Sequence, residues 1–126
     1  MSIKDYVVST VIIYDLILMT NLKKYFDYLA ILDKSNKQLD LDAIDELLLN
    51  VIAKASYEER TLNVKDLLGL KEVASQATIH GRLKKLAEKK LISLKVNGVD
   101  GRVKEVMLTK LANKRFELLS KTIDKA

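Results

Sequence analysis

The stretch that decides the fold is Ser75–Leu91, SQATIHGRLKKLAEKKL. Ser75 can cap a helix that follows it, because its hydroxyl accepts a hydrogen bond from a free backbone N–H of the first turn. Apolar residues then recur at nearly helical spacing, namely Ile79, Leu83, Leu86, Ala87 and Leu91. The pattern predicts an amphipathic helix with one buried face.

The opposite face of this helix is small, polar and basic. It carries Ala77, Thr78, Gly81, Lys84, Lys85 and Glu88, with His80 and Arg82 on its shoulders. A helix that enters the major groove of DNA needs short side chains where the backbones approach and cations beside the phosphates. The alternative on this stretch alone is an ordinary amphipathic helix with a solvated lysine-rich face.

Composition limits the class of protein. A chain of 126 residues makes one domain, or one domain with a long appendage, and 48% hydrophobic residues are enough for a packed core. With no cysteine and one histidine, disulfides, thiolate chemistry and a zinc site are excluded, and we expect no metal and no cofactor. The absence of proline and the presence of only four glycines favour long helices.

Charge is unevenly distributed along the chain. Residues 1–60 hold 7 Lys/Arg and 10 Asp/Glu, a net charge of −3, whereas residues 61–126 hold 15 and 7, a net charge of +8. A basic half of this kind indicates a polyanionic partner such as nucleic acid. The run Val7–Met19 is 13 residues long and contains Asp15, so it is too short and too charged to span a membrane. Without a secretory signal, we expect a cytoplasmic protein with no membrane partner.

Residues 3–32 lack any turn signal and predict one long helix or two abutting helices. The β-branched run VVSTVII could also form a strand, but no hairpin signal follows that would pair it. Because the first part is apolar nearly all the way round, it must be covered on more than one side. A second subunit is the natural cover; the alternative is that the segment closes the core of its own subunit.

The middle of the chain alternates short polar connections with helices. We expect Asp33–Gln38 to be a polar connection, after which Asp40 or Asp42 caps a helix. The apolar stripe of that helix is Ile44, Leu47, Leu48, Val51, Ile52 and Ala55, and Leu49 lies off it, where it could touch another element or subunit. A short extended piece, Thr61–Leu62, precedes a brief helix over Val64–Leu68 that Asn63 caps and Gly69 ends.

After Leu91 the apolar period changes from 3.6 to 2. Residues 92–96 and 103–108 alternate, and the Asn-Gly and Asp-Gly pairs between them tolerate the positive φ angles of tight turns. This predicts a β-hairpin with a charged tip. Thr109 then caps a last helix from Lys110 to about Ile123.

The order of helix, two-helix turn unit, β-hairpin and flanking helix is that of a winged helix. Ser75, Arg82-Leu83-x-x-Leu86-x-x-Lys89-x-Leu91-Ile92, Asp100-Gly101-Arg102 and Leu108-Thr109 together resemble the MarR family of transcriptional regulators over roughly residues 42–115. Lys90 stands where that family usually has glycine. The sequence after the hairpin has room for one helix where members often have two that dimerise, so the long N-terminal helix would carry most of the dimer interface.

The resemblance implies which residues contact DNA. The recognition helix would contribute Ser75, Gln76, Thr78, His80, Arg82, Lys84 and Lys85, and the wing would contribute Lys95, Arg102 and Lys104. In that family the wing arginine enters the minor groove, so Arg102 would do so here and Asp100 would orient it through a salt bridge. Gln can read adenine, although the helical wheel turns Gln76 toward the core side. Thr78 suits a phosphate or a thymine methyl group.

The predicted fold class is therefore mainly α with a small β-hairpin wing. Its predicted parts are a dimerisation segment at 1–38, a winged helix-turn-helix DNA-binding domain at 39–109 and a C-terminal helix at 110–126. We expect a homodimer formed through the N-terminal helix, with a contribution from the C-terminal helix left open, that binds double-stranded DNA. A small-molecule effector is left open but no residue pattern supports one.

The two alternative function classes are a protein-interaction module and an enzyme. The same hairpin and helix can serve a protein partner, as in a winged-helix interaction module of replication or recombination machinery, because fold alone does not settle function. The basic wing favours DNA over that alternative. An enzyme is not expected, because no catalytic triad, paired carboxylates or phosphate-binding loop is visible and the single histidine has no evident partner.

Overall fold

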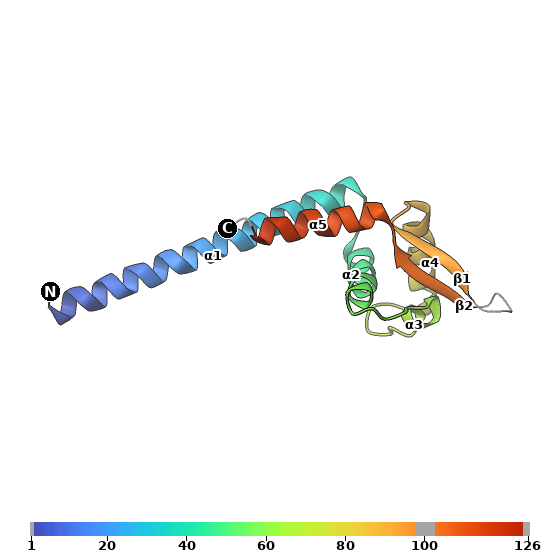
Figure 1. Cartoon of the computed structure of the whole chain (residues 1–126), viewed down its shortest axis with the longest axis horizontal. Coiled ribbons are helices and arrows are strands. Elements are labelled where there is room, and N and C mark those ends of the chain that lie inside the picture. Colours follow the sequence, from blue (N-terminus) through green and yellow to red (C-terminus); the bar gives the residue numbers. More distant parts are fainter. Residues whose placement is uncertain (1, 98–102, 125–126) are drawn as a thin grey trace.

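The molecule consists of one long helix and a small lobe at its C-terminal end (Figure 1). The computed structural model describes residues 2–97 and 103–124. Helix α1 spans Ile3–Gln38, and α5, Lys110–Asp124, lies beside its C-terminal half. The N-terminal half of α1 projects away, with no other described element beside it. The prediction of a helix rather than a strand for the VVSTVII run is confirmed.

The lobe contains the remaining elements. These are α2 (Ala43–Tyr57), α3 (Val64–Leu68), α4 (Gln76–Glu88), β1 (Ile92–Asn97) and β2 (Val103–Leu108). The two strands pair antiparallel with Ile92 opposite Leu108. Asn63 adds an isolated bridge to Glu105, and the N–H of Val106 donates to the carbonyl of Leu62 at 2.8 Å. This element order confirms the predicted winged helix.

The core lies where α2, α4 and the base of the hairpin meet. Its most deeply buried side chains are Leu48, Leu49, Ile52, Leu67, Ile79, Leu86 and Leu91. The stripe predicted for α2 was wrong at Leu47, which is exposed, whereas Leu49, predicted to lie off the stripe and to touch another element, is fully buried. Which face of α2 is buried depends on how α4 and β2 pack against it. The helical periodicity of α2 alone does not contain that information.

The helices begin at polar caps. Asp42 and Asp45 form a reciprocal capping box at α2, in which each carboxylate accepts a hydrogen bond from the other residue's N–H. Of the two predicted caps it is therefore Asp42 that is used. The predicted caps Ser75 and Thr109 accept from the N–H groups of Thr78 and Ala112. These caps satisfy N–H groups that have no partner inside the helix.

Three helices end in the same way, with a non-glycine residue in the left-handed region. Asp40, Glu59 and Lys90 have φ angles of 51°, 56° and 61° and follow α1, α2 and α4. At α4, for example, the N–H of Leu91 donates to the carbonyl of Leu86 and that of Lys90 to the carbonyl of Ala87, both at 3.0 Å. This is the Schellman pattern, in which glycine is the preferred residue at the left-handed position. Lys90, at the position where the resembling family usually has glycine, thus adopts a conformation that favours glycine.

The polar connection predicted at residues 33–38 was wrong, because α1 continues to Gln38. The segment contains no glycine or proline, and Asp33, Asn36 and Lys37 have side-chain partners in the helical state. Arg115 of α5, which is 5% exposed, donates from Nη2 to Oδ1 of Asn36 at 2.7 Å. Asn36 in turn donates to Glu46 of α2 at 3.1 Å. A polar sequence can therefore continue a helix when neighbouring elements bind its side chains.

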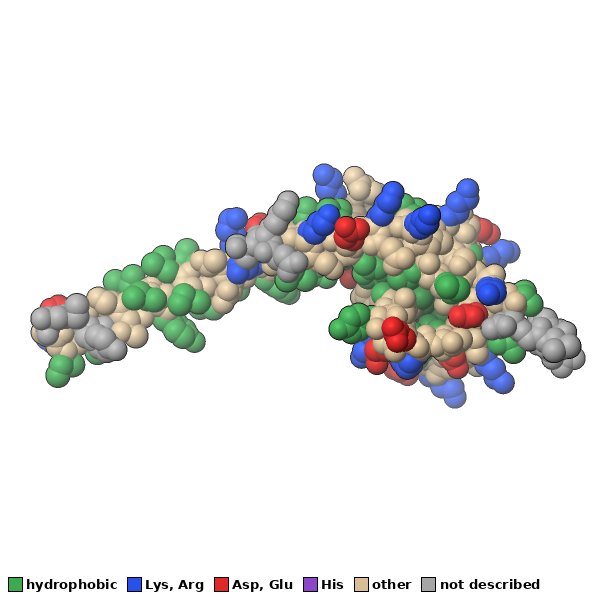
Figure 2. Space-filling model, viewed as in Figure 1, with side chains coloured by type: hydrophobic (Ala, Val, Ile, Leu, Met, Phe, Trp, Pro, Cys, Tyr) green, Lys and Arg blue, Asp and Glu red, His purple; other side chains and the backbone are tan. Residues whose placement is uncertain are grey.

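The projecting half of α1 exposes its apolar side chains, which Figure 2 shows as a green band along the helix. Those more than half exposed include Val8, Ile12, Ile13, Tyr14, Leu16, Ile17 and Met19. No helix in the described part of the chain has the length and apolarity that crossing a membrane requires. This apolar surface is therefore a feature that the single chain leaves uncovered.

Candidate nucleic-acid interface

Helix α4 is held in the lobe by one face and presents another to solvent. Ile79, Leu83 and Leu86 are buried in the core, as predicted. The exposed residues are Gln76, Ala77, His80, Gly81, Lys84 and Glu88. Gln76 thus lies on the exposed face, and the expectation that it turns toward the core was wrong. Residue 76 is in the first turn of α4, before the first buried residue, Ile79.

Near its middle, the exposed face of α4 lacks a side chain at Gly81. A Cβ atom added at Gly81 would meet nothing within 4 Å, so no packing inside the chain requires a glycine there. Thr78 is half-buried, and its hydroxyl accepts a hydrogen bond from Ser75 at 3.0 Å. The hydroxyls of these two predicted DNA contacts therefore lie together at the start of the helix.

Two of the predicted DNA contacts are turned toward another element. Arg82 forms an ion pair with Asp42 and lies 3.5 Å from Asp45. The Nζ atom of Lys85 lies 3.6 Å from Oδ2 of Asp45, which is completely buried. The Arg82 guanidinium, with the N–H of Asp45, lowers the pKa of Asp42 to about 2. Arg82 and Lys85 thus contact the start of α2.

The wing strands carry the remaining predicted cations. Lys95 lies opposite Glu105 and Lys104 opposite Val96 in the ladder, and both lysines are exposed. Lys104 lines an apolar hollow of about 570 Å³ together with His80 and Lys84 of α4. The structure therefore brings together cations from the recognition helix and from the wing. Asp100 and Arg102 lie outside the described residues.

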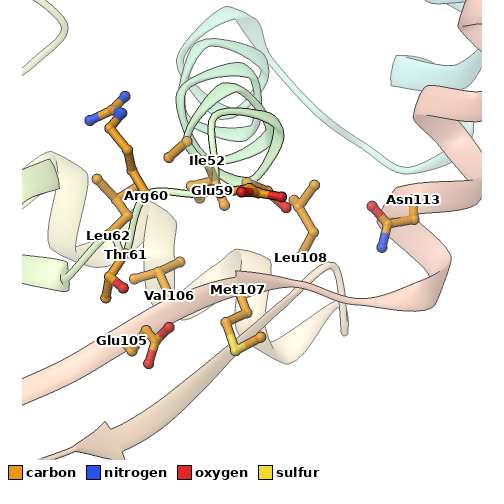
Figure 3. A pocket seen from close by; sticks show the side chains of 12 residues that line it. Ile52, Glu59, Arg60, Thr61, Leu62, Glu105, Val106, Met107, Leu108 and Asn113 are labelled. Atoms are coloured by element: carbon orange, nitrogen blue, oxygen red, sulfur yellow. The ribbon is translucent and has the colours of Figure 1, made fainter.

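A second hollow, of about 360 Å³, lies between the end of α2 and strand β2 (Figure 3). Glu59 and Arg60 come from the turn after α2, Met107 and Leu108 from β2, and Asn113 from α5. It includes none of the predicted DNA-binding residues. No group of residues in the described ranges 2–97 and 103–124 is arranged to hold a metal ion.

The sequence did not predict a role for Lys89. Its Nζ atom donates to the carbonyl oxygen of Leu39 at 2.8 Å, at the end of α1. The signal that could have found it is its spacing from Arg82 and Lys85, since positions i, i+3 and i+7 share one side of a helix.

Comparison with solved structures identifies the fold. The DNA complex of MepR from S. aureus is 22% identical, with a TM-score of 0.60 over 90% of this chain and 83% of that one. This chain has a MarR-like winged-helix fold. A MarR protein from Peptoclostridium difficile is 20% identical, with a TM-score of 0.56 over 87% of this chain and 67% of that one.

The adhesin competence repressor AdcR from Streptococcus pyogenes is 21% identical, with a TM-score of 0.52 over 86% of this chain and 74% of that one. No protein-family model matches the MarR-like chain, and no curated protein matches its sequence. The likeness is thus one of fold, and the function must be argued from the surface of the lobe.

Proposed function

We propose that this chain is a homodimeric, sequence-specific DNA-binding transcriptional regulator of the MarR type. The observation that carries the proposal is the convergence of Lys84 and His80 of α4 with Lys104 of the wing around one hollow. A helix in the major groove with a hairpin beside it needs cations at both places, where the two phosphate backbones pass. The similar MepR protein has been solved in complex with DNA.

Within this proposal the residues divide by role. Gln76 and Thr78 at the start of α4 read or position bases, and Gly81 permits close approach of the helix to the groove. Lys84, Lys95 and Lys104 neutralise phosphates, and Arg102, which lies between β1 and β2 in the sequence, enters the minor groove. Residues 39–109 form the DNA-binding domain.

The proposed dimer interface is the N-terminal segment 1–38, which contains α1, with α5 packed against it. Ile12 and Ile17 are 53% and 55% exposed in the single chain, and Tyr14 is 71% exposed. Burying such side chains against a second copy removes apolar surface from water at about 25 cal/mol per Å². A dimer also suits DNA, because two recognition helices can engage two half-sites of an operator. Another MepR structure holds ethidium bromide, and we propose no corresponding effector here.

The test is binding to random duplex DNA across a series of salt concentrations. Wild type should bind at low salt with a steep negative slope of log affinity against log salt. Lys84→Ala should reduce that slope by about 0.9, the amount expected for one lost phosphate contact. Lys54→Ala is the matched control, because Lys54 is exposed on the side of α2 that faces α5. Absence of binding by wild type at low salt would reject the proposal in favour of a protein-binding winged helix.

A further inference from the structure

Three cations on one side of the recognition helix are bound to the corner that joins α1 to α2. Arg82, Lys85 and Lys89 occupy positions i, i+3 and i+7 of α4 and its C-cap, so they form one row along the helix. None is fully exposed: their side chains are 28%, 38% and 25% accessible. The row lies beside, and not on, the exposed face that carries Lys84.

The first cations of the row bind carboxylates of α2. Arg82 pairs with Asp42, and its Nη1 atom lies 3.5 Å from Oδ1 of Asp45. That oxygen has no hydrogen-bond partner in the described chain, so the carboxylate depends on nearby cations for its stabilisation. Lys85 supplies the second cation, 3.6 Å from the other oxygen of Asp45.

The far end of the row binds the end of α1. The Nζ atom of Lys89 donates to the carbonyls of Leu39 and Asp40, and that of Lys85 lies 3.4 Å from the carbonyl of Asp40. These are carbonyls at the C-terminus of a 36-residue helix, where the helix dipole is negative and the backbone acceptors lack partners within the helix. The cations therefore stabilise the end of α1 and the start of α2 from a single helix.

We propose that Arg82, Lys85 and Lys89 are positioning residues, and we call them the α4 clamp. The clamp fixes the recognition helix relative to the long helix α1, and none of its three members neutralises a phosphate. The effect of the clamp on DNA binding rests on the proposed function. If α1 forms the dimer, the clamp sets the separation and angle of the two recognition helices. Arg82 and Lys85 then act through α1 and α2 instead of as the DNA contacts expected from the sequence.

The clamp predicts a specific pattern of salt dependence. Loss of a phosphate contact lowers both the affinity and the salt slope, whereas loss of a positioning residue lowers affinity alone. Lys89→Met and Lys85→Met should each weaken binding to a selected DNA site by roughly 2- to 30-fold, the range of couplings carried by residues away from a ligand. Their salt slopes should equal that of wild type. A slope reduced by about 0.9 in either variant would overturn the proposal.

A distance measurement tests the clamp without DNA. The chain has no cysteine, so Lys34→Cys on α1 and His80→Cys on α4 allow two spin labels to be attached at exposed positions. Pulsed electron resonance on labelled protein diluted with unlabelled protein reports the distance within one chain. Adding Lys89→Met should broaden or shift the distribution, and adding Lys84→Met, which removes a cation from the exposed face, should leave it unchanged.

The two experiments fail in distinguishable ways. If wild type binds no DNA, the proposed function is rejected, while a distance distribution altered only by Lys89→Met still supports a clamp between α1 and α4. If DNA binds but the distribution is the same with and without Lys89→Met, the clamp is rejected. Because Lys89→Met leaves Arg82 and Lys85 beside the buried carboxylate of Asp45, it avoids an unpaired buried charge and keeps the test independent of gross unfolding.

Discussion

The hydroxyl of Thr109 donates a hydrogen bond to the carbonyl oxygen of Lys90 at 2.7 Å. This contact joins the turn after α4 to the residue that caps α5, and the N–H of Thr109 also donates to the carbonyl of Leu91 at 3.1 Å. The recognition helix, the wing and α5 are thus tied at one point. Lys90 holds its place there with a φ of 61°, which a residue with a Cβ adopts at a cost.

Replacing Lys90 with glycine should increase the free energy of unfolding by about 0.5–1 kcal/mol. Relief of the left-handed strain, roughly 1–2 kcal/mol, outweighs the greater conformational entropy of glycine in the unfolded chain. Urea unfolding measures the difference. Glu59→Gly, at the matching position after α2, should have a similar effect, and Lys90→Ala should have almost none. A destabilised Lys90→Gly would show that the Lys90 side chain has a role that this account omits.

Gly81→Ala should raise the free energy of unfolding by about 1 kcal/mol, because alanine favours a helix and its Cβ meets open space. In the DNA complex the added methyl group should weaken binding, because the proposed function places this face of α4 against the groove. Thermal unfolding and DNA titration of the same preparation check both parts. Unchanged or tighter DNA binding would remove Gly81 from the interface.

The ion pair between Arg82 and Asp42 predicts a dependence of stability on pH. The pKa of Asp42 is lowered from 3.8 to about 2, first by the hydrogen bond from Arg82 and then by the N–H of Asp45. A lowered pKa gives stability that is fully present above the unfolded pKa and is lost as pH falls from about 4 toward 2. Because the Asp42 side chain is about half exposed, we expect about 1 kcal/mol after allowance for solvent screening.

Asp42→Asn tests this expectation because asparagine keeps a cap for α2 but cannot ionise. Urea unfolding at pH 5 and at pH 2 should show a smaller acid-induced loss of stability in the variant than in wild type. Equal losses in the two proteins would mean that the Asp42 pair contributes nothing in this range.

Because the N-terminal half of α1 is apolar and exposed, we expect that one charged side chain placed on it will disrupt the dimer. Ile17→Glu removes about 2 kcal/mol of apolar burial from each subunit, so the dimer dissociation constant should rise at least ~100-fold. Tyr57→Glu, which changes an 89% exposed side chain on α2, is the control and should leave association unchanged. Sedimentation over a range of protein concentrations measures both. A monomeric wild type, or a fully dimeric Ile17→Glu, would contradict the interface.

Local patterns in the sequence predicted most of the fold. The spacing of Ile79, Leu83 and Leu86 predicted α4 and its buried face, and the alternation on either side of the Asn-Gly pair predicted the hairpin. Caps at Ser75 and Thr109 could be predicted because a cap involves residues within one helical turn. These features depend only on neighbours along the chain.

Contacts between segments far apart in the sequence could not be predicted. Asn36 continues α1 because Arg115 and Glu46 bind it, and Arg82 meets Asp42 across 40 residues of sequence. From one segment, a lysine or arginine on the shoulder of a helix looks the same whether it faces a phosphate or a carboxylate. The predicted site was therefore divided by the structure into an exposed set with Lys84 and an internally paired set with Arg82.

Footprinting of wild-type protein on a duplex that it selects from a random library tests most directly whether the protein is a dimeric, sequence-specific DNA binder. We expect two related half-sites whose centres lie about one helical turn apart, roughly 34–36 Å, with protection across both major grooves. Lys84→Ala should lose this footprint at a protein concentration where Lys54→Ala retains it. Selection that yields no preferred sequence, or a single half-site protected alone, would contradict a dimeric and sequence-specific DNA-binding regulator.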